Sequence, residues 1–140
     1  GMSGMSLNRN ATEQDRRIAA RMLESMGRVI EFEEPQLDAV TALSGSGPAY
    51  VFFMAESMIA AGIRLGLTAE DSAILTVQTI KGAVALMETS GQTPEGLREK
   101  VTSPGGTTEA ALSVLAAGRF KNTVVEAIQA AAERAAALSA

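Results

Sequence analysis

The chain has 140 residues, 46% of them hydrophobic, with one Tyr, four Phe and no Trp, Cys or His. This composition suits one domain of closely packed helices, and it excludes disulfides, thiol chemistry and histidine-based catalysis or metal binding. The formal net charge of −4, with 12 scattered Lys and Arg residues, argues against nucleic-acid binding, and no apolar run reaches the roughly 18–20 residues of a membrane span.

The first predicted elements are a helix and a strand. Thr12 is a suitable helix N-cap, and Asp15 three residues later approximates a capping box. Apolar residues then recur at helical spacing until Gly27, which is expected to end the helix. The β-branched and aromatic residues of Arg28–Glu33 predict a strand. Because a lone strand is not stable in water, it either pairs with another chain or belongs to a sheet that this sequence lacks.

From Pro35 onward the sequence predicts only helices. A short helix over Pro35–Leu43 ends at a Ser-Gly-Ser-Gly break, and Pro48 then occupies the first position of the next helix. That helix, Ala49–Leu65, is apolar on nearly every side, which predicts burial on every side. Glycines and capping residues delimit four further predicted helices, Thr68–Thr89, Thr93–Lys100, Thr108–Ala117 and Phe120–Leu138.

The first candidate site is the segment Ser44–Pro48, with the sequence Ser-Gly-Ser-Gly-Pro. It contains G-x-G, but a dinucleotide fingerprint follows a strand and opens a βαβ unit. In this sequence a predicted helix precedes the motif and a proline follows it. The residues alone therefore favour a flexible helix–helix turn, whose serines cap the apolar helix, over a nucleotide site.

The second candidate is the loop Thr102–Thr108, which runs directly into a predicted helix. Two glycines allow backbone N–H groups to point outward together, hydroxyl side chains flank them, and the helix N-terminus adds partial positive charge. These are the features that hold a small carboxylate or phosphate, although the loop lacks the lysine of a triphosphate-binding loop. On the residues alone, a Pro-Gly turn with Thr as helix N-cap fits equally well.

Two long motifs stand in order along the chain. Residues Asp38–Tyr50 read DAVTALSGSGPAY, and residues Val101–Thr108 read VTSPGGTT. Together they resemble the two signatures of the pyrroline-5-carboxylate reductase family, and the resemblance extends over the chain from about Gly4 to the Ala-rich final helix. Agreement of two ordered motifs of this length makes the resemblance specific.

The resemblance implies a two-domain reductase. In this family an N-terminal Rossmann domain holds NAD(P)H, and a C-terminal helical domain forms an intertwined homodimer. The enzyme reduces the C=N bond of 1-pyrroline-5-carboxylate to L-proline, in proline biosynthesis. Residues 1–34 are then expected to be a helix–strand remnant at the end of the nucleotide-binding domain. Residues 35–140 form the all-α helical bundle for dimerisation and substrate binding, so the 140-residue chain alone is expected to be inactive.

The same resemblance assigns the candidate residues. Substrate binding falls to the second motif, through Ser103, Gly105, Gly106, Thr107 and Thr108. The Thr108 hydroxyl is expected to be catalytic, by hydrogen-bonding the ring nitrogen of the imine. Cofactor binding on the nicotinamide side falls to the first motif, through Ser44, Gly45, Ser46, Gly47 and Pro48.

A stand-alone helical dimerisation or small-carboxylate-binding module remains the alternative function. The strand Arg28–Glu33 favours the reductase, because a stand-alone helical module does not account for a strand. The expected partners are a second copy of the chain and a small-molecule substrate, with NADH or NADPH held mainly by the nucleotide domain. No metal, nucleic acid or membrane is expected. Since no signal segment opens the chain, we expect a cytoplasmic protein.

Overall fold

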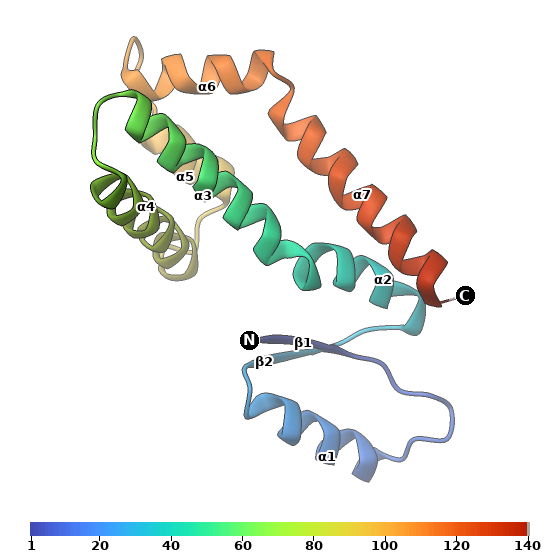
Figure 1. Ribbon diagram of the computed structural model, residues 1–140. Coiled ribbons are helices and arrows are strands. Elements are labelled where there is room, and N and C mark those ends of the chain that lie inside the picture. Colours follow the sequence, from blue (N-terminus) through green and yellow to red (C-terminus); the bar gives the residue numbers. More distant parts are fainter. Residues whose placement is uncertain (140) are drawn as a thin grey trace. The chain divides into compact units, whose positions relative to one another are not determined.

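The computed structural model describes residues 1–139 (Figure 1). It divides into two compact units, one made of Gly1–Pro48 with the residues from Val125 onward, the other of Ala49–Val124. The elements in chain order are β1 (Met2–Met5), α1 (Glu13–Glu24), β2 (Arg28–Glu31), the 3₁₀ turn η1 (Glu34–Gln36), α2 (Leu37–Val40), the π-helical segment η2 (Thr41–Gly45), α3 (Gly47–Arg64), α4 (Ala69–Thr89), α5 (Pro94–Lys100), α6 (Thr107–Ala117) and α7 (Phe120–Ser139). The predicted helical fold is confirmed, with a two-stranded sheet in addition.

The first unit opens with a strand–helix–strand arrangement (Figure 1). Strand β1 lies parallel to β2, with Met2 opposite Arg28. The predicted capping box of α1 is confirmed, because the Thr12 hydroxyl accepts the Asp15 N–H at 3.2 Å and the Asp15 carboxylate accepts the Thr12 N–H at 2.8 Å. The Thr12 hydroxyl also donates to the Asp15 carboxylate at 2.6 Å. This hydrogen bond and the one from the Thr12 amide hold the pKa of Asp15 below its usual value.

The expectation that the strand Arg28–Glu33 has no partner in this chain is wrong. It pairs with β1, whose sequence Met-Ser-Gly-Met contains no β-branched or aromatic residue and so gives no strand signal. Pairing and the packing of α1 supply what the local sequence lacks. The strand also ends at Glu31, because Glu33 already serves as the N-cap of η1.

The predicted break between the two helices is present, but it is shorter than Ser44–Gly47. The chain stays helical from α2 through η2, where the Ser46 N–H donates to the carbonyl of Thr41, five residues back, at 2.9 Å. Pro48 has no N–H to donate to Ser44, and its ring crowds the carbonyl there, which favours a wider turn in place of regular α-helix. Helical backbone thus runs to Gly45 and resumes at Gly47, so the break is Ser46 alone and not a flexible loop of four residues.

The second unit places two helices in close contact at Gly62. A methyl group added there would lie 2.6 Å from the Ser72 Oγ and 3.0 Å from its Cβ. Ser72 is only 2% exposed, and its hydroxyl donates to the Thr68 carbonyl at 2.7 Å. Glycine at position 62 of α3 is therefore required for α4 to approach so closely.

Replacing this glycine provides a test of the packing. We expect Gly62→Ala to destabilise the protein by about 1–3 kcal/mol, because the added methyl forces the buried Ser72 to move. Gly82→Ala is the matched control, since no atom of the described chain lies within 4 Å of that added methyl and alanine favours the helix. Thermal unfolding monitored by circular dichroism measures both. A Gly62→Ala protein as stable as the wild type would contradict the packing.

The predicted burial of the apolar helix is not achieved within one chain. Along α3, the side chains of Phe52 and Phe53 are 64% and 72% exposed. The only buried hydrophobic residue in the described part of the chain is Ala42. The apolar residues are where the sequence predicted them, but a single chain does not supply enough surface to cover them. Large apolar side chains are also exposed on the other long helices, among them Ile74, Leu75, Val77, Val114 and Val125.

Candidate functional site

The loop between α5 and α6 folds into a tight turn at Ser103–Gly106. The Gly106 N–H donates to the Ser103 carbonyl at 2.9 Å, and Gly105 adopts a φ of +71°. Proline at the second position and a left-handed third residue are the pattern of a type II turn, which favours glycine at that third position. A methyl group on Gly106 would lie 2.9 Å from the Ser103 carbonyl oxygen, so the second glycine is needed for the close approach.

The start of α6 differs from the prediction in a way that matters chemically. Thr107 is the first helical residue and Gly106 is the N-cap, which has no side chain to offer. The amides of the first helical turn have no partner inside the helix. Across residues 1–139, the amides of Thr107 and Thr108 accordingly make no hydrogen bond. They form a pair of adjacent donors at the positive end of the helix.

The Gly105 amide, by contrast, is already occupied. It donates to the carboxylate Oε2 of Glu109 at 2.7 Å. Glu109 lies three residues after the N-cap Gly106, the spacing at which a glutamate commonly reaches back to the start of its helix. The sequence analysis missed this residue, although that spacing was the signal that could have found it.

The hydroxyl groups of the loop are largely open. Thr108 is half-buried, whereas Ser103 and Thr107 are exposed. Among the described residues, none of these three hydroxyls has a hydrogen-bond partner within the chain. The hydroxyl of Thr102 instead donates back to the Arg98 carbonyl at 2.7 Å. The loop therefore offers the adjacent amides of Thr107 and Thr108 and these three hydroxyls to a small polar ligand.

The other predicted segment, Ser44–Pro48, lies in the first unit. Its backbone is helical through Gly45, the Ser46 N–H donates to the Thr41 carbonyl, and Pro48 has no N–H, so the segment has few donors for a pyrophosphate. Ser44 stands at the rim of an apolar hollow of about 380 Å³ formed by the sheet and the helical segment after it, with Met2, Gly4, Ile30, Phe32, Gln36, Ala39, Val40 and Leu43. A Cβ added to Gly47 would meet no neighbouring atom within 4 Å, so this face of the turn is open.

These observations divide the predicted residues into two groups. Ser103, Gly105, Gly106, Thr107 and Thr108 come together in one loop of the second unit, whereas Ser44–Pro48 belongs to the first unit. That both groups serve one site stays a prediction. Within the described chain no cluster of three potential metal ligands is found, and no helix is long and apolar enough to cross a membrane.

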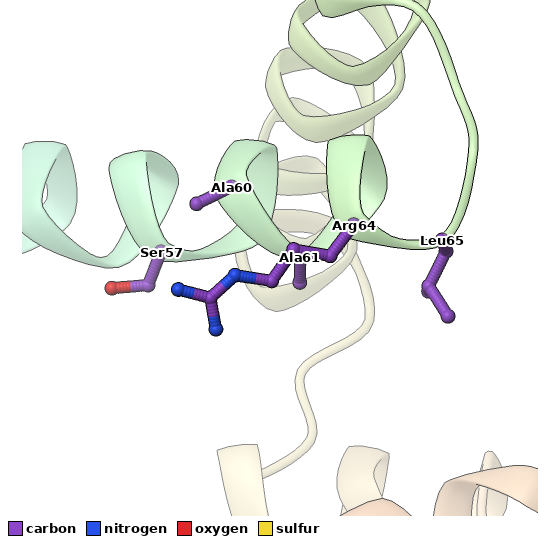
Figure 2. A pocket seen from close by; sticks show the side chains of 5 residues that line it. All are labelled: Ser57, Ala60, Ala61, Arg64 and Leu65. Carbon is purple, nitrogen blue, oxygen red and sulfur yellow. The ribbon is translucent and has the colours of Figure 1, made fainter.

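A further hollow, of about 490 Å³, lies along α3 (Figure 2). Its lining residues are Ser57, Ala60, Ala61, Arg64 and Leu65, and the Arg64 side chain extends back along the helix toward Ser57 (Figure 2). The small side chains permit close approach by another helix, and the hollow contains none of the residues predicted for the site.

The sequence and the fold were compared with known proteins. A family model described as pyrroline-5-carboxylate reductase dimerisation matches residues 34–138. The pyrroline-5-carboxylate reductase of Arabidopsis thaliana is 42% identical over 137 residues, which are 98% of this chain and 50% of that protein. Pyrroline-5-carboxylate reductase 2 of Bacillus subtilis is 42% identical over 134 residues, 96% of this chain and 48% of that protein. The chain thus spans about half the length of the curated relatives it matches.

Solved structures give the same result. The pyrroline carboxylate reductase of Plasmodium falciparum, with NADP bound, superposes with a TM-score of 0.90 at 39% identity, over 95% of this chain and 51% of that one. The pyrroline-5-carboxylate reductase of Coxiella burnetii superposes with a TM-score of 0.91 at 38% identity, over 98% of this chain and 51% of that one.

Proposed function

The chain belongs to the pyrroline-5-carboxylate reductase family, and on that premise we propose that it is the C-terminal part of an enzyme that reduces 1-pyrroline-5-carboxylate to L-proline. The observation that carries the proposal is the match of the dimerisation model to residues 34–138. Residues 1–34 then form the end of a nucleotide-binding domain. The parallel β1–α1–β2 arrangement supports this, because Rossmann sheets are built from such units, and it counts against a stand-alone helical module.

The loop Ser103–Thr108 is proposed to bind the carboxylate of the substrate. Two adjacent amides, those of Thr107 and Thr108, suit the two oxygens of a carboxylate, and the helix N-terminus favours its negative charge. The Ser103 hydroxyl is available as a third donor. Gly105 and Gly106 then contribute by shaping the turn, because their own amides are engaged within the chain.

Thr108 is proposed as the catalytic residue. Its half-buried hydroxyl, without a partner inside the described chain, would hydrogen-bond the ring nitrogen of the imine and orient the C=N bond. Reduction adds a hydride to the ring carbon of that bond and a proton to the nitrogen. The hydroxyl, or a water that it holds, is positioned to assist delivery of the proton, since the chain contains no histidine.

The residues Ser44–Pro48 are proposed to face the nicotinamide ring of NADH or NADPH, which supplies the hydride when bound. The apolar hollow at Ser44 and the open face at Gly47 fit a flat ring. The helical backbone does not fit the pyrophosphate, so that part of the cofactor belongs to the nucleotide-binding domain.

The active form is proposed to be a homodimer located in the cytoplasm. The exposed apolar side chains of α3 and of the other long helices form too large an apolar surface for a monomer in water. A second copy of the chain covers such a surface by the same residues on both sides. The family model that matches the chain describes dimerisation, which supports this assembly.

A chimeric enzyme tests the proposed function. In it, this chain replaces the matching half of the Bacillus subtilis relative, whose nucleotide-binding half is kept. We expect the chimeric enzyme to oxidise NAD(P)H when 1-pyrroline-5-carboxylate is added. The 140-residue chain alone should show no turnover, because it has no G-x-G-x-x-G fingerprint. A soluble, folded chimera without activity would contradict the proposal, and turnover by the chain alone would contradict the domain assignment.

A further inference from the structure

Glu109 directly follows the loop, and the proposed function leaves its side chain without a role. Its carboxylate accepts the Gly105 N–H at 2.7 Å, a length typical of a charge-assisted hydrogen bond. The carboxylate lies in the first turn of α6, where the partial positive charge of the helix stabilises it. The chain thus supplies its own carboxylate beside the donors proposed to bind the substrate's carboxylate.

This contact decides which amides remain available. Glu109 occupies the Gly105 amide, and the Ser103 carbonyl occupies the Gly106 amide. Of the consecutive amides from Gly105 to Thr108, those of Thr107 and Thr108 stay open to an external ligand within the described structure.

The contact also stabilises the turn. Gly105 is exposed, and in the described chain no atom lies within 4 Å of the position of a Cβ on it. With a φ of +71° and little packing around it, this residue depends on the hydrogen bond to Glu109 for its orientation. The hydrogen bond from the Gly106 N–H to the Ser103 carbonyl closes the turn, and the bond to Glu109 is the second one that holds it. Without the Glu109 bond, the Gly105 peptide is held less firmly.

We propose that Glu109 is a positioning residue of the reductase: by holding the Gly105 amide it fixes the orientation of that peptide in the turn and directs the substrate carboxylate to the amides of Thr107 and Thr108. The inference rests on the proposed function of this loop. Glu109 acts through Gly105 and does not itself contact the substrate.

Two variants separate this role from a general structural one. Glu109→Gln keeps an oxygen acceptor for the Gly105 amide, whereas Glu109→Ala removes it. In the chimeric enzyme, Glu109→Ala should raise the KM for 1-pyrroline-5-carboxylate about tenfold, as loss of a hydrogen bond to a charged group does. The kcat and the KM for NAD(P)H should stay within about twofold of the wild type. Glu109→Gln should restore most of the substrate KM.

A second readout does not depend on catalysis. In nuclear magnetic resonance spectra of the 140-residue chain, the Gly105 amide should exchange slowly with solvent in the wild type and in Glu109→Gln, and rapidly in Glu109→Ala. An unchanged substrate KM in an active Glu109→Ala enzyme would overturn the inference while leaving the proposed function intact. A lowered KM would also overturn it, by showing that Glu109 competes with the substrate. An inactive wild-type chimera would instead remove the proposed function.

Discussion

Replacing Thr108 with alanine should lower the kcat of the chimeric enzyme at least about 100-fold, the usual contribution of a positioned proton-transfer group. The Thr108 hydroxyl is half-buried and has no partner in the described chain, so its removal costs the folded protein no internal hydrogen bond. The amide of residue 108 remains in the variant, and carboxylate binding should therefore be largely retained. The loss is expected in turnover, measured as NAD(P)H oxidation at saturating substrate.

Two matched variants accompany this measurement. Thr108→Ser retains the hydroxyl and should keep most of the activity. Thr107→Ala removes the neighbouring, exposed hydroxyl while retaining its amide, and should change kcat only slightly. Dimer formation should be unaffected in all three proteins. Wild-type kinetics in Thr108→Ala would exclude Thr108 from the mechanism, and an equal loss in Thr107→Ala would indicate general disturbance of the loop.

The second large effect is expected at the apolar surface of α3. The 140-residue chain should be a dimer at micromolar concentration, and Phe53→Glu should weaken the dimer at least about 100-fold. The side chain of Phe53 is 72% exposed in the single chain. Burying a phenylalanine contributes about 1.5–3 kcal/mol, and burying an unpaired carboxylate in its place adds a further penalty.

Sedimentation equilibrium measures this change. Gln92→Glu is the control, because it adds the same single negative charge at an exposed position in the loop before α5. That variant should remain dimeric. A monomeric wild-type chain would contradict the proposed assembly, and a Phe53→Glu protein that dimerises normally would show that another surface forms the interface.

Most helices could be predicted because their ends are determined by local chemistry. The hydroxyls of Thr68 and Thr93 cap α4 and α5 as expected. Gly66 and Gly91 end the helices α3 and α4 with positive φ values, a conformation that glycine adopts without strain. Such signals lie within a few residues of the boundary they set, so the sequence alone contains them.

The features that the sequence analysis missed depend on contacts beyond the neighbouring residues. Strand β1 forms only because β2 lies beside it, and its own residues carry no strand preference. The π-helical turn before Pro48 arises from a missing donor four residues after Ser44, which a search for turn residues does not detect. The exposure of the apolar side chains of α3 could not be predicted either, because the single chain contains no element that buries them.

The candidate site was predictable only where it depends on neighbouring residues. Pro104 and Gly105 predict a turn, and the turn is found. Their sequence does not reveal which amides remain free, because that depends on the carboxylate of Glu109 folding back onto Gly105. The roles of Thr108 and of Ser44–Pro48 rest on the family resemblance and await direct measurement.

Deuterium transfer from the nicotinamide shows whether this half-chain supports reduction of the imine. The chimeric enzyme is supplied with 1-pyrroline-5-carboxylate and NAD(P)H carrying deuterium at the transferable position of the nicotinamide, and the product is analysed by mass spectrometry and nuclear magnetic resonance. The account predicts L-proline with one deuterium on the ring carbon that had formed the C=N bond, and about 100-fold slower labelling with Thr108→Ala. Proline without deuterium at that carbon, or no proline from a folded chimera, would contradict it.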